Sequence, residues 1–289
     1  MRVLILGGKG MLGHKAWQVL KDSFDVYVTI RGSFSEVEEF GIFDKSKTIC
    51  NVNVLDFPNL EEEIGEFRPD VILNCIGIVK QISEAHDAVK SIEINSLFPH
   101  KLALLCSKIN SRLIHISTDC VFSGKKGGYT EDDNPDPLDL YGRTKLLGEV
   151  TEGNVLTLRT SIIGRELNTI HGLLEWFFSQ RGKTIKGYTK AIFSGFTTGT
   201  LSAILKDIIL NHKSIKGLYH VSSGSISKFD LLMSIKKKFD LNVEIIPDDQ
   251  FKCDRSLDSS KFRIEAGYIP PLWDTMIREL AEEIEKEAI

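Results

Sequence analysis

The sequence predicts an α/β protein built on a doubly wound parallel sheet. Short apolar runs that end in glycine or small polar residues recur through the first half of the chain, as buried parallel strands do. Apolar residues at helical spacing follow these runs, and a glycine-rich turn joins the first strand to the first helix. A strand, a glycine turn and a helix in this order are typical of the Rossmann-type fold.

The first strand, Val3 to Leu6, runs directly into a turn that carries Gly7, Gly10 and Gly13. In such a turn one glycine allows the bend, one lets a pyrophosphate approach backbone N–H groups, and one allows tight packing of the helix. The spacing is Gly-x-x-Gly-x-x-Gly rather than the Gly-x-Gly-x-x-Gly of the dehydrogenase fingerprint. We predict a dinucleotide site at this turn, formed by Gly7, Gly10, Met11, Leu12 and Gly13.

The second strand, residues 25–30, ends at Arg31, where NAD-binding proteins usually carry an acid that holds the ribose hydroxyls. A guanidinium pairs instead with a 2′-phosphate, and Lys9 supplies a second cation. The sequence therefore favours NADPH as the cofactor, with NADH as the alternative. The competing interpretation of Arg31 is an exposed loop cation.

Two further strands are predicted around residues 48–54 and 69–77. In the doubly wound order, the residues that end these strands face the cofactor. We expect Asn53 and Val54 beside the adenine, and Cys75, Ile76 and Gly77 beside the ribose.

A long helix is predicted from Ala85 to Ile109. Its apolar positions suit packing under the sheet, and they are Ile92, Ile94, Leu97, Leu102 and Leu105. Asn95 is the polar exception on this helix. A structural hydrogen bonder is the favoured interpretation of Asn95, and a water-mediated hold on a catalytic lysine is the alternative.

The fifth strand ends in Ser117 and Thr118, and a polar loop then leads to a helix with Tyr141 and Lys145. The i, i+4 spacing puts phenol and ammonium on one face, where the cation is expected to lower the phenol pKa from about 10. A phenol that protonates a carbonyl while a hydride arrives from a nicotinamide reduces a ketone, and either upstream hydroxyl can bind the same oxygen. Alone, a Tyr-x-x-x-Lys pair is usually a coincidence on a helix surface. The strand end and the glycine turn favour the catalytic interpretation, because the same chemistry requires both.

Composition argues against several other classes of protein. The 289 residues are 42% hydrophobic, which suits a sizeable core, and a formal net charge of -4 argues against nucleic acid or an anionic membrane as the main partner. The five cysteines show no metal-ligand spacing, so we predict no metal site. The apolar run after Met1 is too short for a signal peptide, and no run approaches the roughly 18 apolar residues of a membrane helix. We expect a soluble, cytoplasmic chain.

Four segments carry a family resemblance: the glycine turn, Ser-Thr-Asp-x-Val-Phe-x-Gly at 117–124, Tyr-Gly-x-x-Lys-x-x-Gly-Glu at 141–149, and Leu-Arg-Thr-Ser at 158–161. Together they resemble the extended short-chain dehydrogenases and reductases, and most closely the dTDP-4-dehydrorhamnose reductases. Segments 195–200, 255–262 and 267–273 are similar to later motifs of the same family. The resemblance thus covers most of the chain.

This resemblance implies an NADPH-dependent oxidoreductase that reduces the 4-keto group of a nucleotide-activated 6-deoxyhexose, in dTDP-rhamnose and polysaccharide biosynthesis. It implies a catalytic triad in which Tyr141 is the general acid, Lys145 holds the nicotinamide ribose and Thr118 orients the carbonyl. A guanidinium also suits bidentate contact with the substrate diphosphate at Arg255, where a salt bridge within the lobe is the alternative. The predicted substrate contacts are Thr118, Asp119, Val121, Phe122, Thr160 and Arg255.

Departures from the family pattern fall at the pocket. They include Cys120 in place of tyrosine, Ser123 in place of aspartate, Ile162 in place of an aromatic residue, and the segments 193–194 and 196–197. They leave the sugar and its nucleotide, dTDP, UDP or GDP, open. Two alternatives also stay open: a nucleotide-sugar epimerase with tightly bound NAD, and a non-catalytic regulatory subunit. A dehydratase is disfavoured, because Cys120 follows Asp119 where dehydratases commonly have glutamate.

We divide the chain into an NAD(P)-binding Rossmann domain, residues 1–160 with about 196–222, and a smaller interleaved C-terminal substrate-binding lobe, residues 161–195 and 223–289. In the lobe, Ser227 is predicted to cap a helix that reaches Phe239. A charged helix from Ile277 to Ile289 ends the chain. The expected partner is a nucleotide-sugar, and a homodimer is left open.

Overall fold

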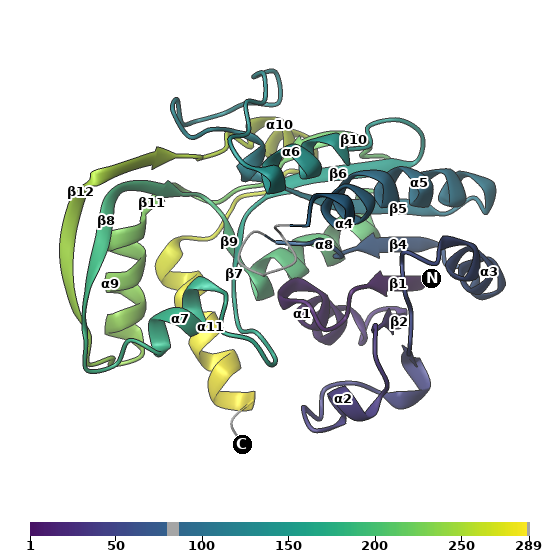
Figure 1. The fold of residues 1–289 in the computed structure, drawn as a ribbon, viewed down its shortest axis with the longest axis horizontal. Coiled ribbons are helices and arrows are strands. Elements are labelled where there is room, and N and C mark those ends of the chain that lie inside the picture. The colour runs from purple at the N-terminus through teal and green to yellow at the C-terminus, as the bar shows by residue number, and fades with distance from the viewer. Residues whose placement is uncertain (80–86, 288–289) are drawn as a thin grey trace.

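The protein is described by a computed structural model that covers residues 1–79 and 87–287. Its main sheet has seven parallel strands in the order β10-β6-β5-β4-β1-β2-β3 (Figure 1). The strands are β1 (Arg2–Leu6), β2 (Asp25–Thr29), β3 (Thr48–Ile49), β4 (Val71–Asn74), β5 (Arg112–Thr118), β6 (Val155–Thr160) and β10 (Gly217–His220). The strand order reverses between β1 and β4, which confirms the predicted Rossmann-type fold.

Helices cover both faces of this sheet. Val3 and Ile5 of β1 pack toward α1 (Met11–Leu20) and α8 (Thr198–Asn211), whereas Leu4 and Leu6 pack toward α3 (Phe57–Phe67) and α5 (Phe98–Lys108). Successive side chains of a strand point to opposite faces, so a strand buried on both sides is apolar throughout. The carboxyl ends of the strands are therefore the edge that is left for a ligand.

The predicted long helix is interrupted. The described part consists of α4 (Ala88–Ile92), the π-helical turn η3 (Glu93–Leu97) and α5, while the predicted start at Ala85 lies outside the described residues. Leu102 and Leu105 are buried as expected. Ile92 and Leu97 are 48% and 46% exposed, so the expectation that they pack under the sheet is wrong. The π turn changes the angular register of the apolar positions, which the 3.6-residue period does not foresee.

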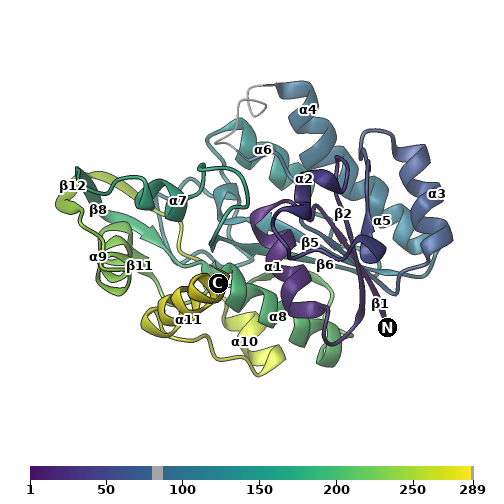
Figure 2. The same cartoon turned by 90° about the horizontal axis from the view of Figure 1, so that it is seen from below.

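A second sheet lies to one side of the first (Figures 1 and 2). Its order is β11-β8-β12, with β8 (Thr184–Phe193) parallel to β12 (Glu244–Asp254) and antiparallel to β11 (Ile226–Ser227). The chain leaves the main sheet after β6, forms β8, returns for α8 and β10, and leaves again for β11. A small parallel pair, β7 (Ile162–Ile163) with β9 (Phe196–Thr197), lies at these crossings.

The second sheet packs against α7 (Leu173–Phe178), α9 (Lys228–Lys238) and α11 (Trp273–Glu287) around its own apolar cluster. The hydroxyl of Ser227 accepts the backbone N–H of Asp230 at 3.0 Å, which confirms the predicted cap of α9. Phe262 of α10 (Ser260–Ala266) and Met276 of α11 instead join the core of the main sheet. The C-terminal segment thus packs against both sheets, and the proposed division into a domain and a lobe stays a prediction.

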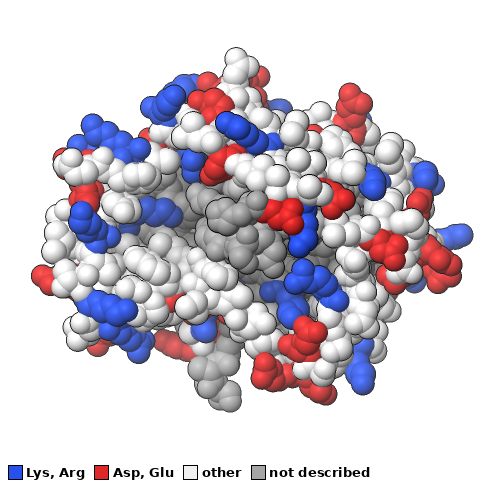
Figure 3. Space-filling model, viewed as in Figure 1, with Lys and Arg blue, Asp and Glu red and all other residues white. Residues whose placement is uncertain are grey.

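The remaining elements are α2 (Ser35–Glu38), α6 (Leu140–Leu147) and the 3-10 helices η1 (Lys45–Lys47) and η4 (Asp119–Val121). Within residues 1–79 and 87–287, no helix has both the length and the apolar character needed to cross a membrane. The same residues contain no cluster of three or more metal-ligating side chains. On the face seen in Figure 3, lysine and arginine side chains alternate with acidic ones rather than forming one basic surface.

Candidate active site

The glycine turn after β1 requires its glycines. Gly7 has a φ of +90°, which favours glycine, and a Cβ on Gly13 would lie 2.1 Å from the carbonyl oxygen of Gly7. A Cβ on Gly10 would lie 3.3 Å from the same oxygen, so this position is tight as well. The turn and the start of α1 therefore form a backbone cradle with little room for side chains, as a pyrophosphate site needs.

Two neighbours of these glycines have other contacts. The side chain of Leu12 is buried in the core of the main sheet, so only its backbone can face a cofactor. The side chain of Met11 reaches the small lobe, because a Cβ on Gly172 would lie 2.7 Å from Met11 Cε. The segment just before α7 thus lies against the glycine turn.

The end of β4 connects this turn to α6. A Cβ on Gly7 would lie 2.9 Å from Ile76 Cγ1, and a Cβ on Gly77 would lie 3.9 Å from the Lys145 Nζ. The next residue, Ile78, is held by Asn95, which accepts its N–H at 2.8 Å and donates to its carbonyl at 2.9 Å. Asn95 is thus a structural hydrogen bonder, the interpretation favoured from the sequence.

Helix α6 brings Tyr141 and Lys145 to the end of β5. Its cap is Asp139, which accepts the N–H of Gly142 at 2.7 Å. The phenol of Tyr141 shares a hydrogen bond with the hydroxyl of Thr118, and Lys145 Nζ donates to the carbonyl of Ile116 at 2.7 Å. The three residues of the predicted triad therefore converge on the carboxyl end of β5.

The prediction that the pKa of the Tyr141 phenol is lowered is wrong. Burial raises the pKa of Tyr141, and the neighbouring Cys120 and Asp119 raise it further. Burial also lowers the pKa of Lys145 to about 8, opposed by the charge of Glu149. Desolvation is the main cause of both shifts.

A buried ion pair lies beneath this site. Glu149 binds Arg159 through two hydrogen bonds of 2.8 and 2.7 Å, and the two side chains are 6% and 3% exposed. Ser117 also donates to Glu149 at 2.6 Å, so its hydroxyl is engaged and Thr118 is the one that faces the phenol. Arg159 further contacts His220 at 3.2 Å, where burial lowers the imidazole pKa to about 4. Glu149 and Arg159 lie within the two family motifs and were not predicted as site residues, although Glu149 follows Lys145 at the i, i+4 spacing of a helix.

Two cations from the C-terminal part of the chain act on Asp119. Burial raises the pKa of this carboxyl, and the charges of Arg255 and Lys228 oppose the shift. Arg255 Nε donates to the carbonyl of Phe122 at 2.8 Å, so it also ties β12 to the loop after β5. The Lys228 Nζ lies 4.0 Å from the centre of the Phe193 ring. Sequence reasoning missed Lys228, because its only signal was its place next to a helix cap.

Val121 and Phe122 do not present side chains to a ligand. Both are fully buried and pack with Tyr129 and Leu257, and the Phe122 and Tyr129 rings stack with centroids 4.1 Å apart. Only the backbone of these two residues is therefore available to a substrate, and their predicted contact stays a prediction. Their side chains instead pack inside the loop that follows β5. Thr160 lies beside Thr118 in the β5–β6 ladder and is 2% exposed.

The adenosine end of the predicted cofactor site is more open. Arg31 and Asn53 are exposed, Val54 is half-buried, and Asn53 Oδ1 accepts the N–H of Leu55 at 3.1 Å. Lys9 forms an ion pair of 2.7 Å with Glu36. Cys75, which follows β4, is close enough to Lys145 to feel its charge, and burial raises the pKa of its thiol to about 12.

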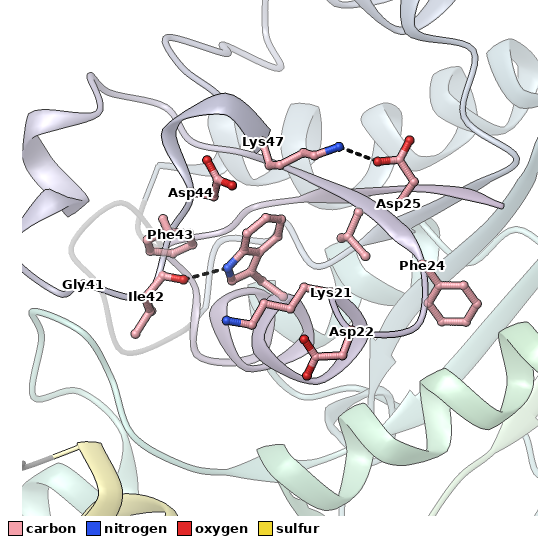
Figure 4. A pocket seen from close by; sticks show the side chains of 11 residues that line it. Lys21, Asp22, Phe24, Asp25, Gly41, Ile42, Phe43, Asp44 and Lys47 are labelled. Atoms are coloured by element: carbon pink, nitrogen blue, oxygen red, sulfur yellow. Dashed lines mark hydrogen bonds and ion pairs between the residues drawn. The ribbon is translucent and has the colours of Figure 1, made fainter.

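A cavity of about 560 Å³ lies elsewhere, at the amino end of β2 (Figure 4). Lys47 and Asp25 form an ion pair of 2.5 Å at its wall, and Trp17 Nε1 donates to the carbonyl of Ile42 at 2.8 Å. No predicted site residue lines this cavity. Because β2 is parallel to β1, the cavity lies at the sheet edge opposite the glycine turn.

The family described as RmlD substrate binding domain matches residues 1–285. The chain belongs to this family. It is thus one of the extended short-chain dehydrogenases and reductases, which are NAD(P)-dependent oxidoreductases, as the sequence predicts.

Two solved structures illustrate the likeness of this RmlD-family chain. It is 30% identical to a hypothetical dTDP-4-dehydrorhamnose reductase from Sulfolobus tokodaii, with a TM-score of 0.78 and coverage of 91% of this chain and 94% of that one. It shares its fold with dTDP-4-dehydrorhamnose reductase from Bacillus anthracis in complex with NADP, with 23% identity, a TM-score of 0.80 and coverage of 98% and 99%.

Curated relatives of this RmlD-family chain include a polysaccharide biosynthesis protein and a subunit of another enzyme. It is 26% identical to the spore coat polysaccharide biosynthesis protein SpsK of Bacillus subtilis, covering 98% of this chain and 97% of that protein. It is also 27% identical to methionine adenosyltransferase 2 subunit beta of Mus musculus, covering 83% of this chain and 72% of that protein.

Proposed function

We propose that this RmlD-family protein uses NADPH to reduce the 4-keto group of a nucleotide-activated 6-deoxyhexose. One observation carries the proposal: Lys145 Nζ faces Gly77 beside the glycine turn, while Tyr141 and Thr118 meet at the end of the neighbouring strand. A reductase of this type needs the dinucleotide cradle and the proton donor at one sheet edge. The relatives named as dTDP-4-dehydrorhamnose reductases support the substrate class.

The residues of this chain fit a nicotinamide dinucleotide. The cradle of Gly7, Gly10 and Gly13, where the backbone leaves little room for added side chains, suits the pyrophosphate. Lys145 would hold the nicotinamide ribose, and Arg31 with Lys9 would hold a 2′-phosphate. When bound, this cofactor supplies the hydride that reduces the carbonyl carbon.

The proton comes from Tyr141. Burial raises the phenol pKa, so Tyr141 is protonated before the reduction and is able to give its proton to the keto oxygen. Thr118 orients that oxygen, since its hydroxyl already meets the phenol. Lys145 is charged below a pH of about 8, so its ammonium is available to hold the nicotinamide ribose.

The substrate diphosphate would lie between Arg255 and Lys228. Both cations act on Asp119 from the small-lobe side of the site. Arg255 also anchors the loop by donating to the carbonyl of Phe122, which is a hydrogen bond and not the salt bridge considered as the alternative. Cys120 is smaller than the tyrosine common in the family, so the identity of the sugar is not part of this proposal.

A regulatory subunit is the second candidate. Its support is the similarity to methionine adenosyltransferase 2 subunit beta. Tyr141, Lys145 and Thr118 are all present and converge, which favours the reductase. An epimerase would use the same residues but would keep NAD bound and return the hydride.

The test is to mix the protein with NADPH and dTDP-4-dehydrorhamnose and follow the absorbance of the reduced nicotinamide. We expect oxidation of NADPH that depends on the sugar and on Tyr141. If neither this sugar nor other 4-keto nucleotide-sugars caused oxidation, the reductase proposal would be overturned. Protein that purifies with bound nicotinamide and interconverts sugars without net oxidation would indicate the epimerase.

A further inference from the structure

A carboxylate occupies the ribose end of the cofactor site. Glu36 Oε2 binds the Lys9 Nζ at 2.7 Å, and Glu36 Oε1 accepts the backbone N–H of Ser33 at 3.2 Å. Arg31 adds a weaker attraction to the same carboxylate. Lys9 belongs to the glycine turn after β1, whereas Arg31 and Ser33 follow β2. Glu36 therefore links the glycine turn to the segment after β2, and we call this place the ribose corner.

The backbone leaves space for this carboxylate. A Cβ on Gly32 would lie 1.8 Å from Glu36 Oε1 and 2.3 Å from the carboxyl carbon. The glutamate therefore folds back directly over Gly32, and any side chain at that position would displace it. Gly32 does not have a positive φ, so the backbone conformation there allows alanine.

This arrangement resembles an anion site that the protein has filled with its own side chain. A 2′-phosphate of NADPH would reach the end of β2, where cations and backbone N–H groups bind it. Lys9 and Arg31 are such cations, and the amide of Ser33 is such a donor, but Glu36 engages them already. Figure 3 shows basic and acidic side chains next to each other over α1 and α2.

We propose that Glu36 competes with the 2′-phosphate for Lys9 and Ser33, and so sets the ratio of NADPH to NADH affinity. The inference rests on the proposed function in one respect: a nicotinamide dinucleotide must bind at the glycine turn. NADPH has to displace the carboxylate or tolerate it as a like charge, whereas NADH brings no phosphate to this corner. Glu36 is exposed, so water solvates the carboxylate once it swings away, and NADPH binding stays feasible.

An opposite role for Glu36 is conceivable from chemistry alone, since acids in this region often hold the ribose hydroxyls. In this protein both carboxylate oxygens already have partners, Lys9 and Ser33. The two roles predict opposite results when the carboxylate is removed. A competitor suppresses NADPH binding, and a ribose ligand supports NADH binding.

The experiment measures the Kd of NADPH and of NADH by fluorescence titration, without sugar, at low ionic strength. Glu36→Gln removes the charge, and Gly32→Ala moves the carboxylate without changing the charge. Both variants are expected to bind NADPH about tenfold more tightly, while NADH affinity changes less than about twofold. Glu38→Gln is the matched control, because Glu38 is an exposed acid of the same helix, and it should leave both values unchanged.

The outcomes separate this inference from the proposed function. Unchanged NADPH to NADH ratios in both variants would overturn the competition, even if the protein reduces a sugar. A loss of NADH affinity in Glu36→Gln would overturn it in favour of a ribose ligand. If wild-type protein bound neither cofactor, the proposed function would fail and this inference with it.

Discussion

The two ion pairs Glu149–Arg159 and Lys9–Glu36 have the same length and opposite surroundings. Both have an N–O distance of 2.7 Å. The first pair is 6% and 3% exposed, with Glu149 just after α6 and Arg159 in β6. Lys9 and Glu36 are 29% and 47% exposed at the proposed ribose end of the cofactor site.

The difference separates a fixed region from an adjustable one. Glu149 and Arg159 are bound to each other by two hydrogen bonds and have further partners in Ser117 and His220. Removal of either charge would leave the other one buried without a counter-ion. Water readily replaces a partner of Lys9 or Glu36, which makes an exchange of anions feasible there. We infer that the chemistry depends on the buried region and the cofactor preference on the exposed one.

The largest effect is expected at Tyr141, which the fixed region positions. Tyr141→Phe removes the proton donor and should lower turnover by about 10²- to 10⁴-fold. Steady-state oxidation of NADPH measures the loss, and fluorescence titration should show cofactor affinity close to wild type. Turnover within a factor of two of wild type would remove Tyr141 from the mechanism.

The buried pair itself should show the next largest effect. Glu149→Gln leaves the Arg159 charge buried without its counter-ion and is expected to cost about 3–5 kcal/mol of unfolding free energy in a urea titration. Glu36→Gln removes the acid of the exposed pair and is the matched control, expected to unfold at the wild-type urea concentration. Equal midpoints for the two variants would break the comparison.

The strand order and the convergence of Tyr141, Lys145 and Thr118 were predictable from the sequence, because apolar periodicity and short motif spacing carry that information. The protonation state of these groups was not predictable from the sequence. The raised pKa of Tyr141 depends on burial by residues distant in the chain, and the interrupted helix at 93–97 depends on a π turn that leaves no periodic trace. Lys228 and Asp119 come together only through packing of the small lobe, which no local pattern encodes.

Lys145 offers a third test of the fixed region, with opposite effects on stability and activity. Its folded pKa of about 8 lies below the value of about 10.4 expected for an unfolded chain. Between these values the unfolded state binds more protons, so the contribution of Lys145 to stability rises with pH through that window. Below pH 8 the cost of burying the charge is fully present.

Lys145→Met should therefore be inactive yet more stable than wild type at pH 7, by about 2 kcal/mol after loss of the hydrogen bond to Ile116. The gain should shrink as the pH rises from 8 toward 10. Thermal and urea unfolding at several pH values measure it. A variant less stable than wild type at pH 7 would show that Lys145 is not held against a desolvation cost.

The smallest effect is expected from the exposed pair. It is the interaction free energy between Lys9 and Glu36 in protein unfolding. In a double-mutant cycle of Lys9→Met and Glu36→Gln, the unfolding midpoints of the single and double variants should coincide with wild type, because solvent replaces each lost partner. The same four proteins should differ in NADPH affinity: Glu36→Gln tightens binding, Lys9→Met weakens it, and added salt reduces both changes through screening. If the midpoints moved as far as they do in Glu149→Gln, Lys9 and Glu36 would belong to the fixed architecture, and the corner would not be free to exchange a carboxylate for a phosphate.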